Sequence, residues 1–357
     1  MKRIVICCDG TWNRADQESP TNVVRTAYLI AKSDADVEQV VYYDQGVGTG
    51  NSLDRLTGGA FGNGLEENIH EAYRFLVANF EPHDELFLFG FSRGAYTVRS
   101  LGGMIRKCGI LRRSSVDQYQ NAVDLYRDGQ HPDEDEPKLF RKNHSVVGDT
   151  EIPIAYLGVW DTVGALGIPL AGLRALTRRP HQFHDTELSG SVKRARQALA
   201  IDEQRKPFAP TLWRHQPKPG QLVEQVWFAG VHSDIGGGYL DRGISDLALR
   251  WILDGAIEAG LHLDVEALEA FPLTPDSSAR LHDSMNLFFR TLGSMDRPIG
   301  LMPRDPRDPG SEQLMPDATQ SVHESVRRRW DDDGRYRPRA LRAYFERSGD
   351  PRGGGSS

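Results

Sequence analysis

Three residues that together can carry nucleophilic catalysis each stand in or after an apolar run: Ser92, Asp161 and His232. A serine hydroxyl is a poor nucleophile at neutral pH and needs an imidazole to accept its proton. The imidazole in turn needs a carboxylate, which fixes its tautomer and stabilises the cation that it becomes. The three residue types therefore predict a Ser-His-Asp triad.

The serine lies in a Gly-x-Ser-x-Gly pattern at residues 90–94. The pattern alone is a weak signal, because the chain has 36 glycines among 357 residues. An apolar run from Leu86 precedes the serine, and apolar residues at helical spacing follow it from Ala95 to Ile105. Strand, sharp turn and helix are the context of a nucleophile elbow, and the order Ser-Asp-His is that of α/β-hydrolases. A plain strand-to-helix turn is the alternative.

The other apolar runs predict the elements that position these residues. We expect strands at 4–8, 37–43, 86–91, 154–160 and 222–231, and helices at 20–32, 65–80, 192–199 and 244–259. Carboxyl ends of parallel strands meet at one sheet edge, where residues distant in sequence can share a pocket. The expected fold class is α/β, an α/β-hydrolase-like, mostly parallel sheet flanked by helices.

Outside these elements the sequence predicts insertions in one elaborated domain. Residues 112–150 are polar and indicate a surface excursion, while the apolar stretch 167–179 is either a candidate lid or a core-packed crossover. Beyond about residue 263 we expect irregular structure with a short helix at 321–330. The domain is assigned to residues 1–345, with its core motifs within 1–260, and a disordered tail to 346–357.

The oxyanion hole of such an enzyme uses backbone N–H groups. The residue after the nucleophile, Arg93, is the first candidate donor, and the turn after the first strand offers Gly10 or Thr11 as the second.

Three further aspartates, Asp9, Asp44 and Asp234, also stand at expected strand ends. They suggest an alternative in which a divalent cation activates water. We instead assign them to the surroundings of the triad, Asp9 and Asp234 as loop or turn caps, because no His-rich ligand spacing accompanies them. A dinucleotide-binding reading of the glycines at 46–50 lacks the third glycine of the fingerprint. We expect no metal or cofactor.

Composition narrows the classes of partner. The net charge of −7 disfavours nucleic-acid binding, since no excess of Lys and Arg is available to neutralise phosphates. Cys7, Cys8 and Cys108 form neither a disulfide framework nor a zinc set. The N-terminal apolar run is too short for a signal peptide, and no stretch is long enough to span a membrane. We expect a cytoplasmic protein, unless a dedicated secretion system exports it.

Four motifs in order carry a family resemblance: residues 9–13, 90–95, 158–164 and 230–239. Together they resemble the uncharacterised bacterial α/β-hydrolase family that includes the catalytic domain of type VI secretion phospholipase effectors, over about residues 1–260. The resemblance implies a Ser92-Asp161-His232 lipase or esterase acting on phospholipid or related acyl esters. It also implies a neutralising or secretion partner.

The expected function is a serine carboxylic-ester hydrolase of lipolytic, phospholipase A-like character that works through an acyl-enzyme. A non-lipid esterase or thioesterase of the same fold is one alternative. A hydrolase-fold interaction module with an unused site is another. Arg93, Arg99 and the pair Arg178 and Arg179 are candidate phosphate contacts, although we favour solvated or salt-bridged roles for them. Transient contact with a membrane surface fits a lipid substrate.

Overall fold

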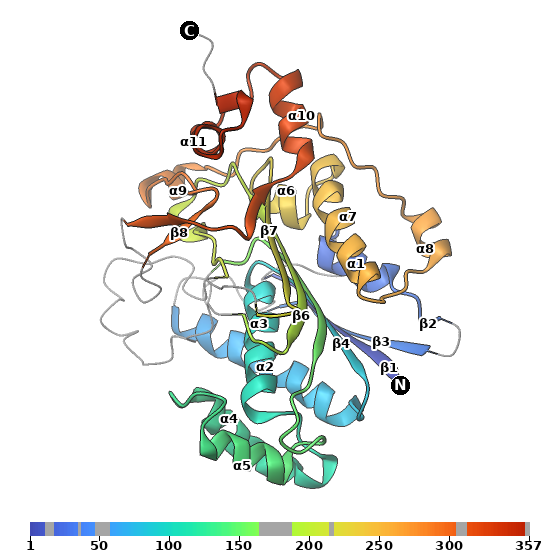
Figure 1. Ribbon diagram of the computed structural model, residues 1–357. Coiled ribbons are helices and arrows are strands. Elements are labelled where there is room, and N and C mark those ends of the chain that lie inside the picture. Colours follow the sequence, from blue (N-terminus) through green and yellow to red (C-terminus); the bar gives the residue numbers. More distant parts are fainter. Residues whose placement is uncertain are drawn as a thin grey trace.

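The computed structural model describes residues 1–10, 18–34, 37–46, 58–163, 188–213, 218–304 and 313–353. In this part of the chain eight strands form one sheet (Figure 1). They are β1 (Lys2–Cys8), β2 (Ser33–Asp34), β3 (Val37–Asp44), β4 (Glu85–Phe91), β5 (Ile154–Trp160), β6 (Val192–Ala200), β7 (Leu222–Phe228) and β10 (Gln320–Val322). The order is β10-β7-β6-β5-β4-β1-β3-β2, and only β2 pairs antiparallel to its neighbour.

Helices cover both faces of the sheet (Figure 1). One face packs against α2 (Gly58–Asn79) and α3 (Arg93–Cys108), and the other against α1 (Asn22–Leu29) and α7 (Gly243–Glu258). The mostly parallel sheet between two helical layers confirms the predicted α/β fold class.

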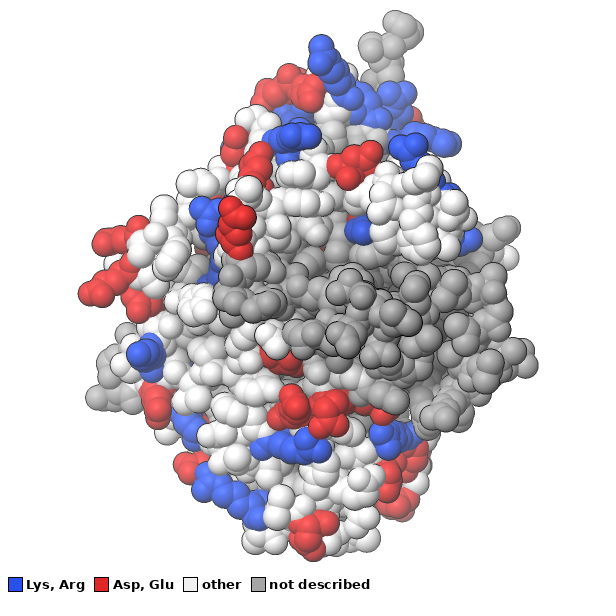
Figure 2. Space-filling view, turned by 180° about the vertical axis from the view of Figure 1, so that it is seen from behind, with Lys and Arg blue, Asp and Glu red and all other residues white. Residues whose placement is uncertain are grey.

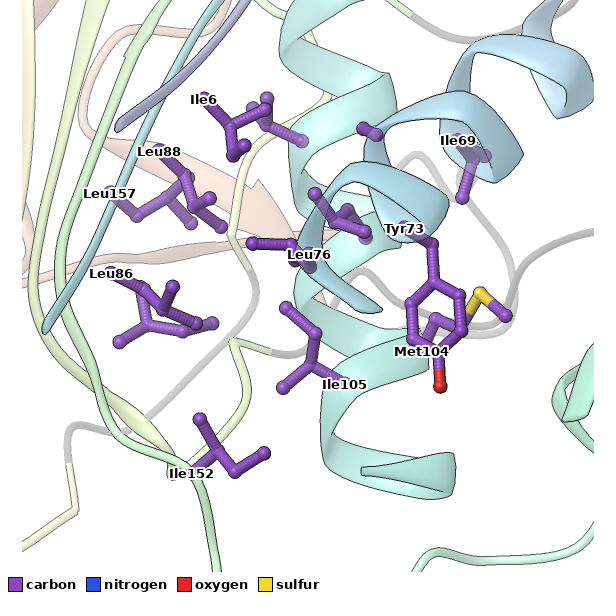
Figure 3. Close-up of a cluster of buried hydrophobic side chains, with 14 of the residues drawn as sticks. Ile6, Ile69, Tyr73, Leu76, Leu86, Leu88, Met104, Ile105, Ile152 and Leu157 are labelled. Carbon is purple, nitrogen blue, oxygen red and sulfur yellow. The ribbon is translucent and has the colours of Figure 1, made fainter. Parts of the chain in front are cut away.

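Figure 3 shows how the first of these cores is built. Side chains from the sheet point toward side chains of α2 and α3, and all of them are buried. The labelled residues are Ile6, Leu86, Leu88, Ile152 and Leu157 on the sheet side, Ile69, Tyr73 and Leu76 on α2, and Met104 and Ile105 on α3. Their burial holds α3, and with it the turn before α3, firmly against β1 and β4.

The remaining described helices surround this sandwich. They are α4 (Tyr119–Arg127), α5 (Asp135–His144), α6 (His232–Gly236), α8 (Val265–Ala270), α9 (Leu287–Thr291), α10 (Glu324–Asp332) and α11 (Arg339–Ser348). A small hairpin of β8 (Leu301–Pro303) and β9 (Leu314–Pro316) stands apart from the main sheet. Trp330 and Phe345 of the last two helices pack with Trp227 of β7.

Two sequence-based expectations are wrong. Residues 192–199 are the central strand β6 rather than a helix, because β5 and β7 bind this segment on both sides. Residues 112–150 are not only a surface excursion, since Ala122, Val123 and Leu125 of α4 are buried in the core beside α3.

The C-terminal end also differs from its prediction. The disordered tail was expected from residue 346, but α11 runs to Ser348 and a short 3-10 turn, Pro351–Gly353, follows. Burial of Leu341 and Phe345 gives this helix an apolar face to fold against. The assignment of residues 1–345 to one domain stays a prediction, and the candidate lid at 167–179 lies outside the described residues.

Candidate active site

Ser92 occupies a sharp turn between β4 and α3. Its φ of 58° is a conformation that a residue with a side chain rarely adopts. A Cβ on Gly90 would lie 2.5 Å from the Gly94 carbonyl oxygen, and one on Gly94 would lie 2.0 Å from the Cys8 carbonyl oxygen. The close passage of strand, helix and β1 therefore requires glycine at both positions. This is the geometry of a nucleophile elbow.

Asp161 and His232 meet at the same edge of the sheet. Asp161 directly follows β5, and His232 begins α6 shortly after β7. The His232 Nδ1 and the Asp161 Oδ2 are 2.6 Å apart, and both side chains are buried. The structure thus brings the predicted histidine and aspartate together as a hydrogen-bonded pair.

Ser92 lies beside this pair. The Ser92 backbone N–H donates to the carbonyl of Trp160, the residue before Asp161, at 3.0 Å. The imidazole of His232 packs against the ring of Phe91, the residue before Ser92, with 4.6 Å between ring centroids. The edge of Phe208 contacts the same imidazole at 5.0 Å. Two aromatic rings therefore fix the histidine next to the elbow.

Arg297 is a member of the site that sequence reasoning missed. Its Nη1 and Nη2 donate to the two carboxylate oxygens of Asp161 at 2.6 and 3.0 Å, and its side chain is fully buried. Burial alone would raise the pKa of Asp161, but the charge of Arg297 and the hydrogen bond from His232 outweigh it and hold the pKa well below its ordinary value. No local pattern marks Arg297, since it lies 136 residues beyond its partner.

A second buried carboxylate, that of Glu203, binds the backbone of His232. The Glu203 Oε2 accepts from the His232 backbone N–H at 3.2 Å and from Arg205 Nη2 at 2.7 Å. Its two oxygens also accept from the Ser284 hydroxyl at 3.1 Å. Burial opposes the charge of Glu203, but the bonds from Arg205 prevail and lower its pKa. This network fixes the backbone from which the imidazole projects.

Asp234 caps α6, as one reading of the sequence predicted. Its Oδ2 accepts from the Val231 N–H at 2.9 Å, while its Oδ1 lies 2.6 Å from His282 Nδ1. The ring of Tyr239 stacks on that of His282 with centroids 3.8 Å apart. Asp234 therefore holds the start of α6 and ties it to residues near 282.

Asp9 and the oxyanion candidate Gly10 share a hydrogen bond. Asp9 Oδ1 accepts from the Gly10 N–H at 2.7 Å, and Oδ2 accepts from Thr21 and, at 3.1 Å, from Tyr43. Asp9 thus binds the N–H of Gly10, one of the two candidates for the second oxyanion donor, and the choice between Gly10 and Thr11 stays a prediction. Thr11 lies outside the described residues.

Asp44 stands at the end of β3, two strands away from β4. Its Oδ1 accepts from the Gly46 N–H at 2.8 Å, and its backbone carbonyl accepts from the Asp9 N–H at 2.8 Å. Burial raises the pKa of Asp44 to about 6. These contacts give Asp44 a part in shaping the loops after β1 and β3.

Of the arginines considered for phosphate contact, Arg99 has a structural role. It donates to the Thr211 carbonyl at 2.6 Å and lies over the ring of Trp213 at 5.3 Å. Burial lowers the pKa of Arg93 to about 10. Arg178 and Arg179 lie outside the described residues.

Within the residues that the structure describes, no three His, Cys, Asp or Glu side chains gather as metal ligands would. In the same part of the chain, no helix combines the length and apolar character that crossing a bilayer requires.

Asp202, which follows β6 near the site, makes stability depend on pH. Its Oδ2 accepts from the Gly230 N–H at 2.6 Å and from the Tyr336 hydroxyl at 2.9 Å, and burial raises its pKa to about 6. The folded state therefore holds this proton to higher pH than the unfolded chain, whose Asp pKa is about 3.9. The resulting stabilisation is complete below about pH 4 and is lost as the pH rises through about 6.

We expect Asp202→Asn to remove this part of the pH dependence and to be more stable than wild type at pH 7.5. The amide oxygen of Asn can accept from both donors, so the substitution removes the charge and keeps the contacts. Urea unfolding at pH 5 and pH 7.5 measures the effect. An unchanged difference between the two pH values would contradict the assignment to Asp202.

Residues 2–255 match the family profile described as type VI secretion system, phospholipase effector Tle1-like, catalytic domain. An uncharacterized Saccharomyces cerevisiae protein, YEL023C, is 29% identical over an alignment of 238 residues that covers 60% of this chain and 33% of the yeast protein.

Two solved structures are also similar. An uncharacterized protein from Pseudomonas aeruginosa aligns over 81% of this chain and 48% of its own, with 20% identity and a TM-score of 0.42. The Tle1 effector bound to the VgrG spike of the type VI secretion system aligns over 67% of this chain and 51% of its own, with 20% identity and a TM-score of 0.38. This chain thus spans a third of the yeast relative and about half of each solved chain. On the match of its residues 2–255, the chain belongs to the family of Tle1-like phospholipase effector catalytic domains.

Proposed function

We propose that this chain is a serine hydrolase that cleaves the carboxylic esters of phospholipids through an acyl-enzyme. The observation that carries the proposal is Ser92 in a glycine-flanked turn, next to a buried His232–Asp161 pair. Membership of a phospholipase effector family supports the lipid class of the substrate.

In the proposed reaction, the Ser92 Oγ attacks the acyl carbonyl carbon while His232 accepts the hydroxyl proton. Because Nδ1 faces Asp161, Nε2 is the nitrogen that receives it. The protonated imidazole then donates this proton to the departing alcohol, which leaves an ester on Ser92. A water molecule, deprotonated by His232, attacks that ester and releases the fatty acid.

The negative charge on the carbonyl oxygen needs backbone donors. Arg93 is the first residue of α3 and directly follows Ser92, which is the position that supplies an oxyanion donor in a nucleophile elbow. We assign one oxyanion contact to the Arg93 N–H. With the Gly10 N–H bound to Asp9, the neighbouring Thr11 is the proposed second donor.

An exposed apolar helix beside the site supports action at a lipid surface. Leu287 and Phe288 of α9 are 82% and 47% exposed. The next residue, Phe289, packs edge-on against Phe208, which contacts the imidazole of His232. In Figure 2, the upper right surface, on the side where α9 and β8 lie in Figure 1, is uncharged and has both basic and acidic side chains near its margins. Exposed apolar side chains on a short helix are typical of segments that bind phospholipid interfaces.

We expect the double substitution Leu287→Ser and Phe288→Ser to weaken binding to anionic phospholipid vesicles, and their hydrolysis, by about tenfold, since it removes the apolar area that would enter the bilayer. Hydrolysis of a soluble short-chain ester should stay within about twofold of wild type. Vesicle cosedimentation and the two rates measure this.

The control replaces two other exposed apolar residues far from the site, Val116 and Leu139, by serine. It should leave both rates unchanged. If the α9 variant and the control behave alike on vesicles, α9 is not the lipid-contacting element.

Activity-based labelling tests the function itself. A fluorophosphonate should add to the wild-type protein at one site, and peptide mapping should identify Ser92, because only an activated serine reacts at a useful rate. Product analysis with phospholipid vesicles, short-chain esters and thioesters then separates a phospholipase from a non-lipid esterase or thioesterase. A folded protein that takes no label would favour a hydrolase-fold interaction module.

Delivery is a separate proposal. The solved relative is a Tle1 effector bound to a VgrG spike. By that likeness we propose export by a type VI secretion system and a neutralising partner in the producing cell.

A further inference from the structure

Arg297 makes an unusual addition to the His-Asp pair. Besides its two bonds to Asp161, it donates to the backbone carbonyls of Ala200 at 2.9 Å and Phe208 at 2.6 Å. Four hydrogen bonds and complete burial leave the guanidinium one position. A planar fork with two parallel bonds fixes a carboxylate in both distance and rotation.

The residue comes from outside the part of the chain that matches the family. The match ends at residue 255, and Arg297 belongs to a segment that also contributes His282 and Ser284. These contact Asp234 and Glu203, which accept from the backbone N–H groups of Val231 and His232. Residues 282–297 therefore hold the catalytic region at three points.

The charges around His232 explain what Arg297 adds. They are Asp161 with Arg297, Glu203 with Arg205, Asp234 with His282, and Asp202, which binds the Gly230 N–H and the Tyr336 hydroxyl. In a triad without an arginine, the aspartate charge is available to stabilise the imidazolium. Here a permanent cation already neutralises Asp161, so a proton on His232 adds an uncompensated positive charge to a buried site.

We propose that Arg297 is a positioning residue that orients Asp161 and sets the lower pH limit at which His232 serves as the base. The proposal rests on the hydrolase function given above. It adds that the enzyme works at lower pH with Arg297 than it would without it. The residue responsible lies beyond the part of the chain that matches the family.

The test compares pH profiles of kcat/KM for wild type, Arg297→Lys and Arg297→Met on a soluble ester. The acidic limb of such a profile reports protonation of the free enzyme's base. In Arg297→Met it should move to higher pH by about one unit, because the imidazolium regains the full aspartate charge. In Arg297→Lys the charge remains, so the limb should stay in place while kcat falls with loss of the two-point contact.

Arg141→Met is the matched control. Arg141 is also a buried arginine that binds a carboxylate, Asp149, and several backbone carbonyls, but it lies on α5, remote from the site. Its loss should affect stability without moving the acidic limb of the kcat/KM profile to another pH. A limb that stays at the wild-type pH in Arg297→Met, with only a lower kcat, would overturn the proposal and leave Arg297 a structural role.

A second measurement does not depend on catalysis. NMR titration of the His232 ring in wild type, Arg297→Lys and Arg297→Met should show the same shift in the methionine variant alone. If this shift occurs and no ester is hydrolysed, the proposed function fails, and with it the role of His232 as a base, while the effect of Arg297 on the imidazole holds. If hydrolysis is observed and the titration does not move, the inference fails alone. Arg297→Gln removes the charge but keeps an amide donor, and it replaces the methionine variant if that variant does not fold.

Discussion

Replacing Ser92 by alanine is expected to lower hydrolysis of a short-chain ester by about 10⁴-fold or more, and to abolish fluorophosphonate labelling. Loss of the nucleophile removes the covalent route, so only the oxyanion donors and substrate binding remain to assist the attack of water. The measurements are kcat/KM, intact mass after labelling, and circular dichroism to verify the fold.

Ser100→Ala is the matched control for this prediction. Ser100 is a buried serine on α3, two turns beyond Ser92, and it belongs to no part of the proposed machinery. It should retain wild-type hydrolysis and labelling. If Ser92→Ala kept either one, the nucleophile would be another residue and the elbow would be only a strand-to-helix turn.

Gly94→Ala is expected to destabilise the protein by about 3 kcal/mol or more, the range of a severely overpacked core position. The added Cβ would lie 2.0 Å from the Cys8 carbonyl oxygen and 2.6 Å from that of Asp9. Both contacts are with the backbone at the end of β1, which cannot rotate away as a side chain can. Relief requires α3 to move away from β1, and that movement also displaces Ser92. We therefore expect activity to fall together with stability.

Urea unfolding measures the loss as a lower midpoint at constant m-value. Gly129→Ala is the comparison, because a Cβ there meets nothing within 4 Å. It should lie within about 0.5 kcal/mol of wild type, as other exposed substitutions do. A Gly94→Ala protein as stable as Gly129→Ala would mean that α3 and β1 pass less closely than the structure shows.

The strand-end residues were predictable from the sequence because a parallel sheet gathers the carboxyl ends of its strands at one edge. Asp161 and His232 follow two clear apolar runs, and their contact follows from topology alone. The same rule could not separate Asp161 from Asp9, Asp44 and Asp234. Short-range hydrogen bonds to turns and caps make those three useful at strand ends, and only the folded structure shows that Asp161 is the one that binds the His232 ring.

β6 was not predictable for a different reason. Its sequence contains alanine and arginine, which favour helices, and it is buried between two strands, so no alternation of apolar and polar residues marks it. Arg194 and Arg196 reach Glu258 and Glu224 at the surface, which explains how a central strand carries two charges. Tertiary pairing here overrides local propensity.

No local sequence pattern identifies Arg297 as part of the site. Its importance depends on one long-range contact with a residue 136 positions earlier, in a segment whose prolines and arginines indicated only irregular structure. Sequence patterns report which side of an element faces the core, and a single side chain that enters the core from a loop leaves no such pattern.

The separation between Asp161 and Arg297 also has a consequence for the order of events during synthesis. Translation at about 5–20 residues per second places roughly 7 to 27 seconds between the appearance of Asp161 and that of its cation. During this interval the growing chain contains the elbow and the first strands but lacks Arg297, the residue that binds the Asp161 carboxylate. It also lacks β10, which pairs with β7. The bond between Asp161 and Arg297 therefore forms only after residue 297 has been synthesised, well after the elbow and the first strands.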